Sequence, residues 1–343
     1  MKNLYVVLLF ISLFLVSCGI GTENSQKQGF RPVAGVPVDT VAIDTMELRD
    51  PFIILDKEAR TYYMTGTGGR VWTSKNLRHW VGPYEILELD TTMWMGSKPT
   101  IWAPEIHKHK DKYYYMATFT RHDVIIDNVA GRDIPRRSCQ MFVSNNLLGP
   151  YEPIIGERPL LRADQPALDA TFCDDEYGSC YMIYGHEWIQ NWDGTVQIIL
   201  LSDDLTEQVG EPFVMFTASQ NPWSSGLDSL GNKSFSPVMD APYLFDTEGG
   251  KLGILFSTYI DDEYSVGVAY STLYGLNGPW EIEPEPLLRD HQGHPMLFKD
   301  FDGTLVMAVH KDTVINNRRT SVPRLIEMDD QFEKLQVQGY YKF

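Results

Sequence analysis

Residues 52–64 read Phe-Ile-Ile-Leu-Asp-Lys-Glu-Ala-Arg-Thr-Tyr-Tyr-Met, which is an apolar run, a charged turn and a second apolar run. Two short segments of this kind around a turn predict a β-hairpin. The same pattern returns four more times along the chain, so it is a repeat rather than an isolated motif. The further copies span residues 106–116, 171–183, 243–255 and 296–307.

A second element follows each of the first four hairpins. It is a strand that ends at a serine, and the serines are Ser74, Ser144, Ser202 and Ser271. Gly-Pro-aromatic triplets follow three of them, at 82–84, 149–151 and 278–280. The fifth unit closes less clearly, near residues 325–328. Each unit therefore supplies three or four strands.

Five units of this composition, without a convincing amphipathic helix, predict an all-β fold, namely a five-bladed β-propeller. Radial repetition leaves few exposed sheet edges, which protects a long all-β chain from edge-to-edge pairing. A pair of β-sandwiches is the alternative architecture. Sandwiches do not predict five similar hairpins at this spacing.

The composition bounds the function. The chain has 343 residues, of which 43% are hydrophobic and 22% charged, with a formal net charge of −17. Nucleic acids and anionic lipid surfaces are bound by basic surfaces, so this charge argues against both as electrostatic partners. We expect a monomer that acts on neutral or cationic molecules and has no nucleic-acid partner.

The N-terminus is typical of an export signal. Lys2 precedes an almost wholly apolar stretch at 4–16, too short to span a membrane and suited to a signal peptide. Residues 15–19 (LVSCG) resemble a bacterial lipoprotein cleavage box with Cys18 as the lipidated residue. We expect a signal peptide (1–17), a polar tether (18–30) and one propeller domain (31–343), with a lipid anchor in the bacterial outer membrane on its periplasmic or surface face. An ordinary secretory signal is the alternative.

Three cysteines remain after Cys18. Cys173 and Cys180 flank an acidic turn, and both a disulfide across it and two free thiols are open interpretations. Cys139 is expected to be a buried free thiol. No Cys/His spacing in the chain resembles a zinc site.

The innermost strand of each blade lines the central channel of a propeller, so the residues that begin these strands meet there. Aligned hairpins place five residues at equivalent positions: Asp50, Ala103, Asp169, Ala241 and His294. Asp240 and Trp102 lie one residue earlier in their units. Several carboxylates are costly in a dry core, but they suit a wet acid–base site in which like charges separate their pKa values.

At these residues the chain resembles glycoside hydrolase family 43, five-bladed propellers that act on arabinose, xylose and related furanosides. The similarity covers roughly residues 47–335. It implies an inverting glycosidase with a carbohydrate substrate and no organic cofactor. Residues 48–53 (LRDPFI) are similar to the family's general-base strand, which makes Asp50 the base. Residues 167–172 (ALDATF) are similar to the strand of the second aspartate, which makes Asp169 the residue that orients the acid and tunes its pKa.

The acid position departs from the family pattern. The family usually carries a Glu in a Glu-Gly-Pro segment, and the matching stretch here is MDAPY at 239–243. Asp240 is therefore the candidate acid, with a side chain one methylene shorter. Glu105 and Glu187 are rivals, for which we prefer a salt bridge and a substrate hydrogen bond. If the acid function were lost, the chain would be a non-catalytic glycan-binding lipoprotein, which is the alternative function. Related propellers with an Asn-Asp-Pro nucleophile match residues 49–51 poorly.

The resemblance also implies substrate and metal positions. Residues 102–105 (WAPE) are similar to the family's second-blade signature in the sugar site, and GHEW at 185–188 follows the third hairpin. The predicted substrate-binding residues are Trp102, Glu105, His186, Glu187 and Trp188, with Trp94 as a further stacking candidate. QGHPM at 292–296 is similar to the segment whose histidine often lies next to, or ligates, Ca²⁺ or Na⁺, so His294 is the metal candidate.

The ends and insertions of the domain suggest a subtype. No accessory sandwich follows the fifth unit, so we expect an arabinanase or arabinofuranosidase type rather than a xylosidase type. The long insertions at 121–137 and 217–236 are placed to shape the mouth of the channel, which decides between endo and exo cleavage.

Overall fold

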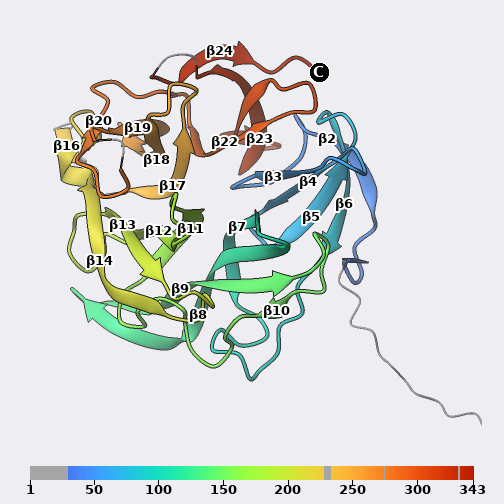
Figure 1. Cartoon of the computed structure of the whole chain (residues 1–343), viewed down its shortest axis with the longest axis horizontal. Coiled ribbons are helices and arrows are strands. Elements are labelled where there is room, and N and C mark those ends of the chain that lie inside the picture. The colour runs from blue at the N-terminus through green and yellow to red at the C-terminus, as the bar shows by residue number, and fades with distance from the viewer. Residues whose placement is uncertain (1–29, 228–232, 274, 331–332) are drawn as a thin grey trace, which may run out of the picture.

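The computed structural model describes residues 30–227, 233–273, 275–330 and 333–343. Its strands form five sheets arranged as a ring, with β3, β7, β11 and β17 near the centre (Figure 1). Each sheet corresponds to one unit of the sequence repeat, so the predicted five-bladed β-propeller is confirmed. The predicted signal peptide, Cys18 and all of the tether except residue 30 lie outside the described residues.

The first three blades run from the channel to the rim as antiparallel stacks. Blade 1 contains β3 (Phe52–Asp56), β4 (Thr61–Gly66), β5 (Arg70–Ser74) and β6 (His79–Glu85), and the short β1 (Arg31–Pro32) and β2 (Asp39–Ala42) both pair with β6. Blade 2 contains β7 (Thr100–His109), β8 (Lys112–Val129), β9 (Arg132–Ser144) and β10 (Glu152–Pro153). Blade 3 contains β11 (Ala167–Asp174), β12 (Cys180–His186), β13 (Thr195–Leu201) and β14 (Gln208–Thr217).

The last two blades follow the same plan. Blade 4 contains β17 (Asp240–Asp246), β18 (Leu252–Ile260), β19 (Glu263–Ser271) and β20 (Trp280–Ile282), and the insertion before it adds the 3₁₀ helix η1 (Ala218–Gln220) and the strands β15 (Ser225–Leu227) and β16 (Lys233–Phe235). Blade 5 contains β21 (Gln292–Lys299), β22 (Leu305–Ile315), β23 (Arg318–Asp329) and β24 (Gln336–Tyr340). The other insertion, at 121–137, extends β8 and β9 into a long hairpin.

The hydrophobic core lies between the blades. Every neighbouring pair of blades shares a cluster of buried apolar side chains, and so do blades 5 and 1. At that closure Phe52 and Trp80 belong to the same cluster as Met296 and Val306. The ring is therefore closed by the same burial of apolar surface that joins the other blades.

The five innermost strands share a distortion at one end of the channel. Five residues there have positive φ angles between 44° and 58°: Asp50, Ala103, Asp169, Ala241 and His294. In blades 2 to 5 the pairing register also shifts beside this residue. Residues other than glycine rarely adopt this conformation, so its recurrence marks a built feature of the fold. It also confirms the alignment made from the sequence.

Cys139, Cys173 and Cys180, the cysteines that the structure describes, are free thiols. The register of β11 and β12 pairs Cys173 with Tyr181 and Asp174 with Cys180. Successive residues of a strand point to opposite faces, so the two thiols lie on different faces of the sheet and the disulfide interpretation is wrong. Cys139 is buried, as expected.

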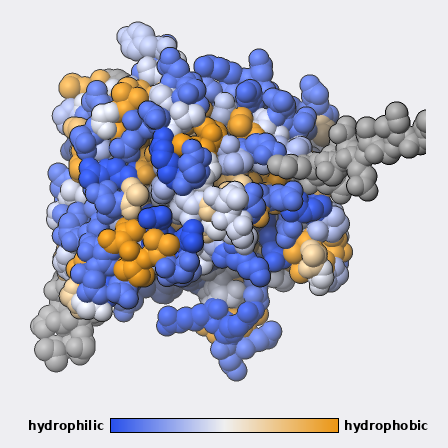
Figure 2. All heavy atoms as spheres, turned by 90° about the horizontal axis from the view of Figure 1, so that it is seen from below, coloured by the Kyte–Doolittle hydropathy of each residue, from blue (hydrophilic) through white to orange (hydrophobic). Residues whose placement is uncertain are grey.

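The surface agrees with the acidic composition. Hydrophilic residues cover most of the face seen in Figure 2, and hydrophobic residues form small separate patches. Among the residues that the structure describes, no helix has the length and hydropathy needed to cross a bilayer.

Candidate active site

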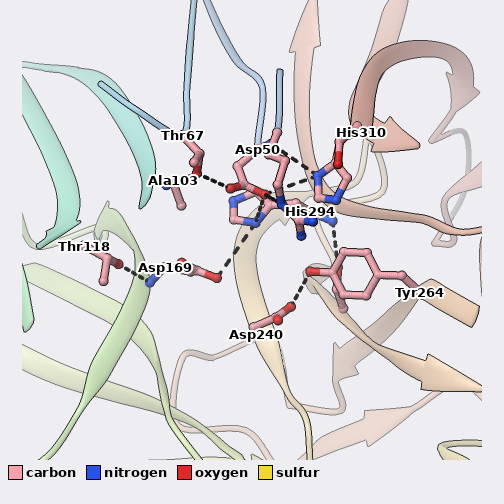
Figure 3. Close-up of polar contacts among 12 residues, drawn as sticks. Asp50, Thr67, Ala103, Thr118, Asp169, Asp240, Tyr264, His294 and His310 are labelled. Carbon is pink, nitrogen blue, oxygen red and sulfur yellow. Dashed lines mark hydrogen bonds and ion pairs between the residues drawn. The ribbon is translucent and has the colours of Figure 1, made fainter. Parts of the chain in front are cut away.

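Three carboxyl groups and one imidazole converge at one end of the channel (Figure 3). Asp50, Asp169, Asp240 and His294 come from the channel side of blades 1, 3, 4 and 5. The His294 Nδ1 lies 3.2 Å from Asp50 Oδ1 and 3.8 Å from Asp169 Oδ2. The structure thus brings together the three aspartates and the histidine that the repeat alignment singled out.

Asp50 is held as an ionised carboxylate. The Thr67 hydroxyl donates a hydrogen bond to its Oδ2. Burial alone would raise the pKa of Asp50, but His294, His310 and Arg49 outweigh it and keep the pKa well below its usual range. A carboxylate that stays ionised at neutral pH can accept a proton, which is what a general base requires.

Asp240 has the opposite character. Burial raises its pKa to about 7, and the negative charge of Asp50 acts in the same direction. The Tyr264 hydroxyl donates to Asp240 Oδ1 at 2.6 Å and opposes the shift, because it stabilises the ionised carboxylate. A carboxyl that keeps its proton near neutral pH can donate it, which is what a general acid requires.

Asp169 is buried beside both. Burial raises the pKa of Asp169 to about 7, His294 opposes that shift, and the charges of Asp240 and Asp50 reinforce it. Neighbouring carboxyls with one ionised and one protonated member are the usual arrangement for paired acid and base chemistry. The channel therefore holds a base and a candidate acid whose protonation states differ at the same pH.

A repeated hydrogen bond holds the distorted backbone. In four blades a side chain on or just after the second strand accepts the amide N–H of the positive-φ residue in the next blade. The bonds are Ala103 N to Thr67 Oγ1 (3.2 Å), Asp169 N to Thr118 Oγ1 (2.8 Å), His294 N to Ser257 Oγ (2.8 Å) and Asp50 N to His310 Nδ1 (3.2 Å). Gly185 occupies this position in blade 3. These acceptors were not predicted from the sequence. An alignment of the second strand of each repeat would have placed them at one equivalent position.

Comparison with known proteins identifies the family. Residues 42–330 match the glycosyl hydrolases family 43. The chain belongs to this family. An endo-arabinase from Bacteroides thetaiotaomicron of known crystal structure is 28% identical and has a TM-score of 0.70, covering 88% of this chain and 99% of that one.

Two further relatives are similar over different extents. An extracellular endo-α-(1→5)-L-arabinanase of Thermotoga petrophila is 28% identical in an alignment over 188 residues, and the match covers 45% of this chain and 36% of that protein. This family 43 chain thus matches little more than a third of that relative's length. An exo-1,5-α-L-arabinanase from a bovine ruminal metagenomic library is 17% identical with a TM-score of 0.62, covering 86% of this chain and 98% of that one, and shares the fold.

Two predicted substrate residues of this family 43 chain lie in one buried cluster. Arg137 donates to Glu187 in an ion pair, and the Arg137 guanidinium lies 4.3 Å from the centre of the Trp102 ring. The Glu187 carboxylate is thus paired with the Arg137 guanidinium, a partner that was not predicted from the sequence. This arrangement favours the preferred interpretation that Glu187 is not the acid.

The remaining candidates contact protein partners. Glu105 lies two residues beyond Ala103 on β7, and its Oε2 is 2.6 Å from His107 Nε2. Glu105 lies within β7 rather than at its end, and its substrate role stays a prediction. His186 Nε2 is 3.0 Å from the Gln190 side chain.

The two other tryptophans differ in burial. Trp94 is buried and donates its indole N–H to Gln140, so it packs inside blade 2 rather than offering a sugar platform. Trp188 is half-buried, and its carbonyl accepts the amide N–H of Trp192. Trp188 lies in the loop after β12, and its substrate role stays a prediction.

The expected cation was tested against the donor set. Within the described ranges no group of three or more His, Cys, Asp or Glu side chains is arranged to hold a metal ion. The Nδ1 of His294 faces Asp50 and Asp169, which leaves only Nε2 for a metal. These residues fit only a cation that keeps most of its ligands as water. A Ca²⁺ or Na⁺ ion beside His294 stays a prediction.

Proposed function

We propose that this family 43 chain is an inverting glycosidase of the arabinanase type that cleaves arabinose-containing polysaccharides or oligosaccharides. The observation that carries the proposal is the opposite protonation of Asp50 and Asp240 in one channel. The 28% identical endo-arabinase and endo-arabinanase support arabinan over the xylose- and galactofuranose-containing members of the substrate class.

The reaction follows from these protonation states. Asp50 takes a proton from a water molecule as the water oxygen bonds to the anomeric carbon. Asp240 gives its proton to the leaving oxygen as the glycosidic bond breaks, so the configuration inverts. Asp169 is assigned to orienting the acid and tuning its pKa, and the interaction between the two carboxyls, in which Asp240 raises the pKa of Asp169, supports this role. Proton exchange with solvent then restores both groups.

The test is hydrolysis of arabinan and of the 4-nitrophenyl α-L-arabinofuranoside, β-D-xyloside and β-D-galactofuranoside. We expect wild type to cleave the arabinose substrates, and Asp50→Asn and Asp240→Asn to lose about 10²–10⁴-fold of the activity on arabinan. Glu105→Gln and Glu187→Gln are the matched controls, and we expect both to retain a general acid. Wild type that binds arabinan without cleaving any substrate would overturn the proposal in favour of the glycan-binding alternative.

We propose the endo mode of cleavage, because the two relatives at 28% identity are both named for it. An endo enzyme cuts inside the polymer, so the viscosity of an arabinan solution should fall before free arabinose accumulates. Release of arabinose at constant viscosity would indicate exo cleavage instead.

We propose that the chain is exported and anchored to the bacterial outer membrane by a lipid on Cys18. The apolar stretch and the LVSCG segment support this, and one relative is named as extracellular. Expression in a Gram-negative host with radiolabelled palmitate should label wild type in the membrane fraction. Cys18→Ser should be unlabelled and soluble, and an unlabelled wild type would contradict the anchor.

A further inference from the structure

A stacked pair of aromatic rings lies beside the candidate base and the candidate acid (Figure 3). The rings of Tyr264 (β19) and His310 (β22) are 5.5 Å apart between centroids and inclined by 25°. Both side chains are buried, with residue exposures of 2% and 0%. A Cβ on Gly293 would lie 2.0 Å from the Tyr264 ring, so the absence of a side chain at Gly293 makes room for the stack.

Each ring holds one of the two reacting carboxyl residues. The His310 Nδ1 accepts the amide N–H of Asp50, whose backbone has the uncommon φ of 56°. The Tyr264 hydroxyl donates to Asp240. Burial raises the pKa of Tyr264, and the charge of Asp240 adds to this, so the hydroxyl keeps the proton that it donates. Base and acid are thus joined through two stacked side chains: His310 of blade 5 holds Asp50 of blade 1, and Tyr264 holds Asp240 within blade 4.

His310 differs from its counterparts in the other blades. In blades 1, 2 and 4 the acceptor of the backbone N–H is a hydroxyl, from Thr67, Thr118 and Ser257. In blade 5 the acceptor is the imidazole ring of His310. Among the described residues the His310 Nε2 has no hydrogen-bond partner, and it lies 3.7 Å from Asp312 Oδ1. Burial lowers the pKa of His310, and the neighbouring Asp50 carboxylate opposes that shift. The ring makes two contacts besides the backbone hydrogen bond: its Nδ1 lies 3.2 Å from Asp50 Oδ1, and its face stacks on Tyr264.

We propose that His310 and Tyr264 are a positioning pair that fixes the acid carboxyl of Asp240 relative to the Asp50 base. The inference rests on the proposed function, because it concerns the same reaction. The pair explains how an aspartate can act where the family usually has a glutamate. The Tyr264 hydroxyl holds the shorter side chain, and the stack on His310 fixes the position of Tyr264 relative to Asp50. Misplacement of a reacting group by about 1 Å can cost about 10²-fold in rate.

The first test separates the clamp from the bulk of the ring. His310→Thr supplies the acceptor that blades 1 and 2 use, and His310→Val has nearly the same shape without it. We expect kcat on arabinan to be about 10-fold higher for His310→Thr than for His310→Val, with KM values within about twofold. Both should fall below wild type because both lose the stack. Equal kcat values for the two variants would overturn the role of His310.

The second test removes only the Tyr264 hydroxyl. Tyr264→Phe keeps the stack and loses the hydrogen bond that favours ionised Asp240. We expect kcat to fall about 10-fold and the alkaline limb of the kcat profile to move up by about one pH unit, with KM little changed. An unchanged limb and an unchanged kcat would overturn the role of Tyr264. The other groups that act on this carboxyl electrostatically stay the same in both proteins, namely Arg49, Asp50, Asp169, Glu187 and Tyr259.

A measurement without catalysis distinguishes failure of this inference from failure of the proposed function. The folded-state pKa of Asp240 is raised, so its stabilising contribution is present below the unfolded pKa and is lost as pH rises through about 7. Tyr264→Phe raises that pKa further, so its Tm should fall more between pH 4 and pH 9 than that of wild type. If wild type is inactive but the two proteins differ in this fall of Tm, the proposed function is wrong and the contact between Tyr264 and Asp240 still holds. Parallel Tm curves would overturn the contact whatever the activity.

Discussion

Asp240 is one methylene shorter than the glutamate usual at this position in the family, and its surroundings are built for the shorter side chain. The Tyr264 hydroxyl already lies at hydrogen-bond distance, and Asp50 raises the pKa of Asp240 from the other side. A longer carboxyl here would have to displace the Tyr264 hydroxyl. The residue is therefore part of a fitted site and not a decayed version of the usual one.

Asp240→Glu should consequently lower activity although it restores the usual residue. We expect kcat on arabinan to fall about 10-fold or more, because the carboxyl moves by about one C–C bond. Steady-state kinetics on arabinan check this, with Asp246→Glu as the control, since Asp246 lies at the exposed far end of the same strand. A rise in kcat would show that the site tolerates, and prefers, the longer acid.

At the start of β21, a residue that packs against Tyr264 is followed directly by a residue of the candidate active site. Gly293 has no side chain and so leaves room for the Tyr264 ring. The next residue, His294, has a positive φ. Gly293→Ala should lower the Tm by roughly 3–10 °C, because overpacking a filled core costs about 1–3 kcal/mol. It should also lower kcat, since the ring must move. Thermal unfolding checks this, with Gly156→Ala as the control because a Cβ there meets only ordinary contacts at 3.7 Å or more. Equal Tm values for the two variants would contradict the close approach.

The repeat made the innermost strands predictable and left the rest of the site hidden. Asp50, Asp169 and His294 could be found because one alignment of hairpins places them at one position of the fold. Tyr264 and Arg137 could not, because their roles depend on contacts between strands from different parts of the chain. Cys173 and Cys180 show the same limit: proximity in sequence suggested a bridge, and the register of a single residue excludes it.

For the molecule as a whole, pH should control activity through the pair of carboxyls. Asp50 is ionised across the accessible range, so activity should not fall on the acidic side until the fold itself suffers. Asp240 must be protonated, so activity should fall by half near pH 7 and continue to fall above it. Initial rates on arabinan from pH 4 to 9 check this. A profile that rises through pH 7 would reverse the assigned roles.

The stability of the fold should depend on pH because Asp240 is buried. Ionised Asp240 is unfavourable in its buried site, and the loss of stability appears as pH rises through about 7. Asp240→Asn should therefore raise the Tm at pH 8 by roughly 3 °C or more and change it little at pH 5. Calorimetry at the two pH values checks this, and a variant with no advantage at pH 8 would contradict the raised pKa.

If Asp50 activates water while Asp240 protonates the leaving group, the first product must have the inverted anomeric configuration. Proton NMR during the first minutes of hydrolysis of a 4-nitrophenyl α-L-arabinofuranoside or of arabinan oligosaccharides resolves the two anomers before they equilibrate. The account predicts that the β-anomer appears first, because water attacks from the face opposite the leaving group. Initial appearance of the α-anomer would require a covalent intermediate and would contradict the roles given to both aspartates.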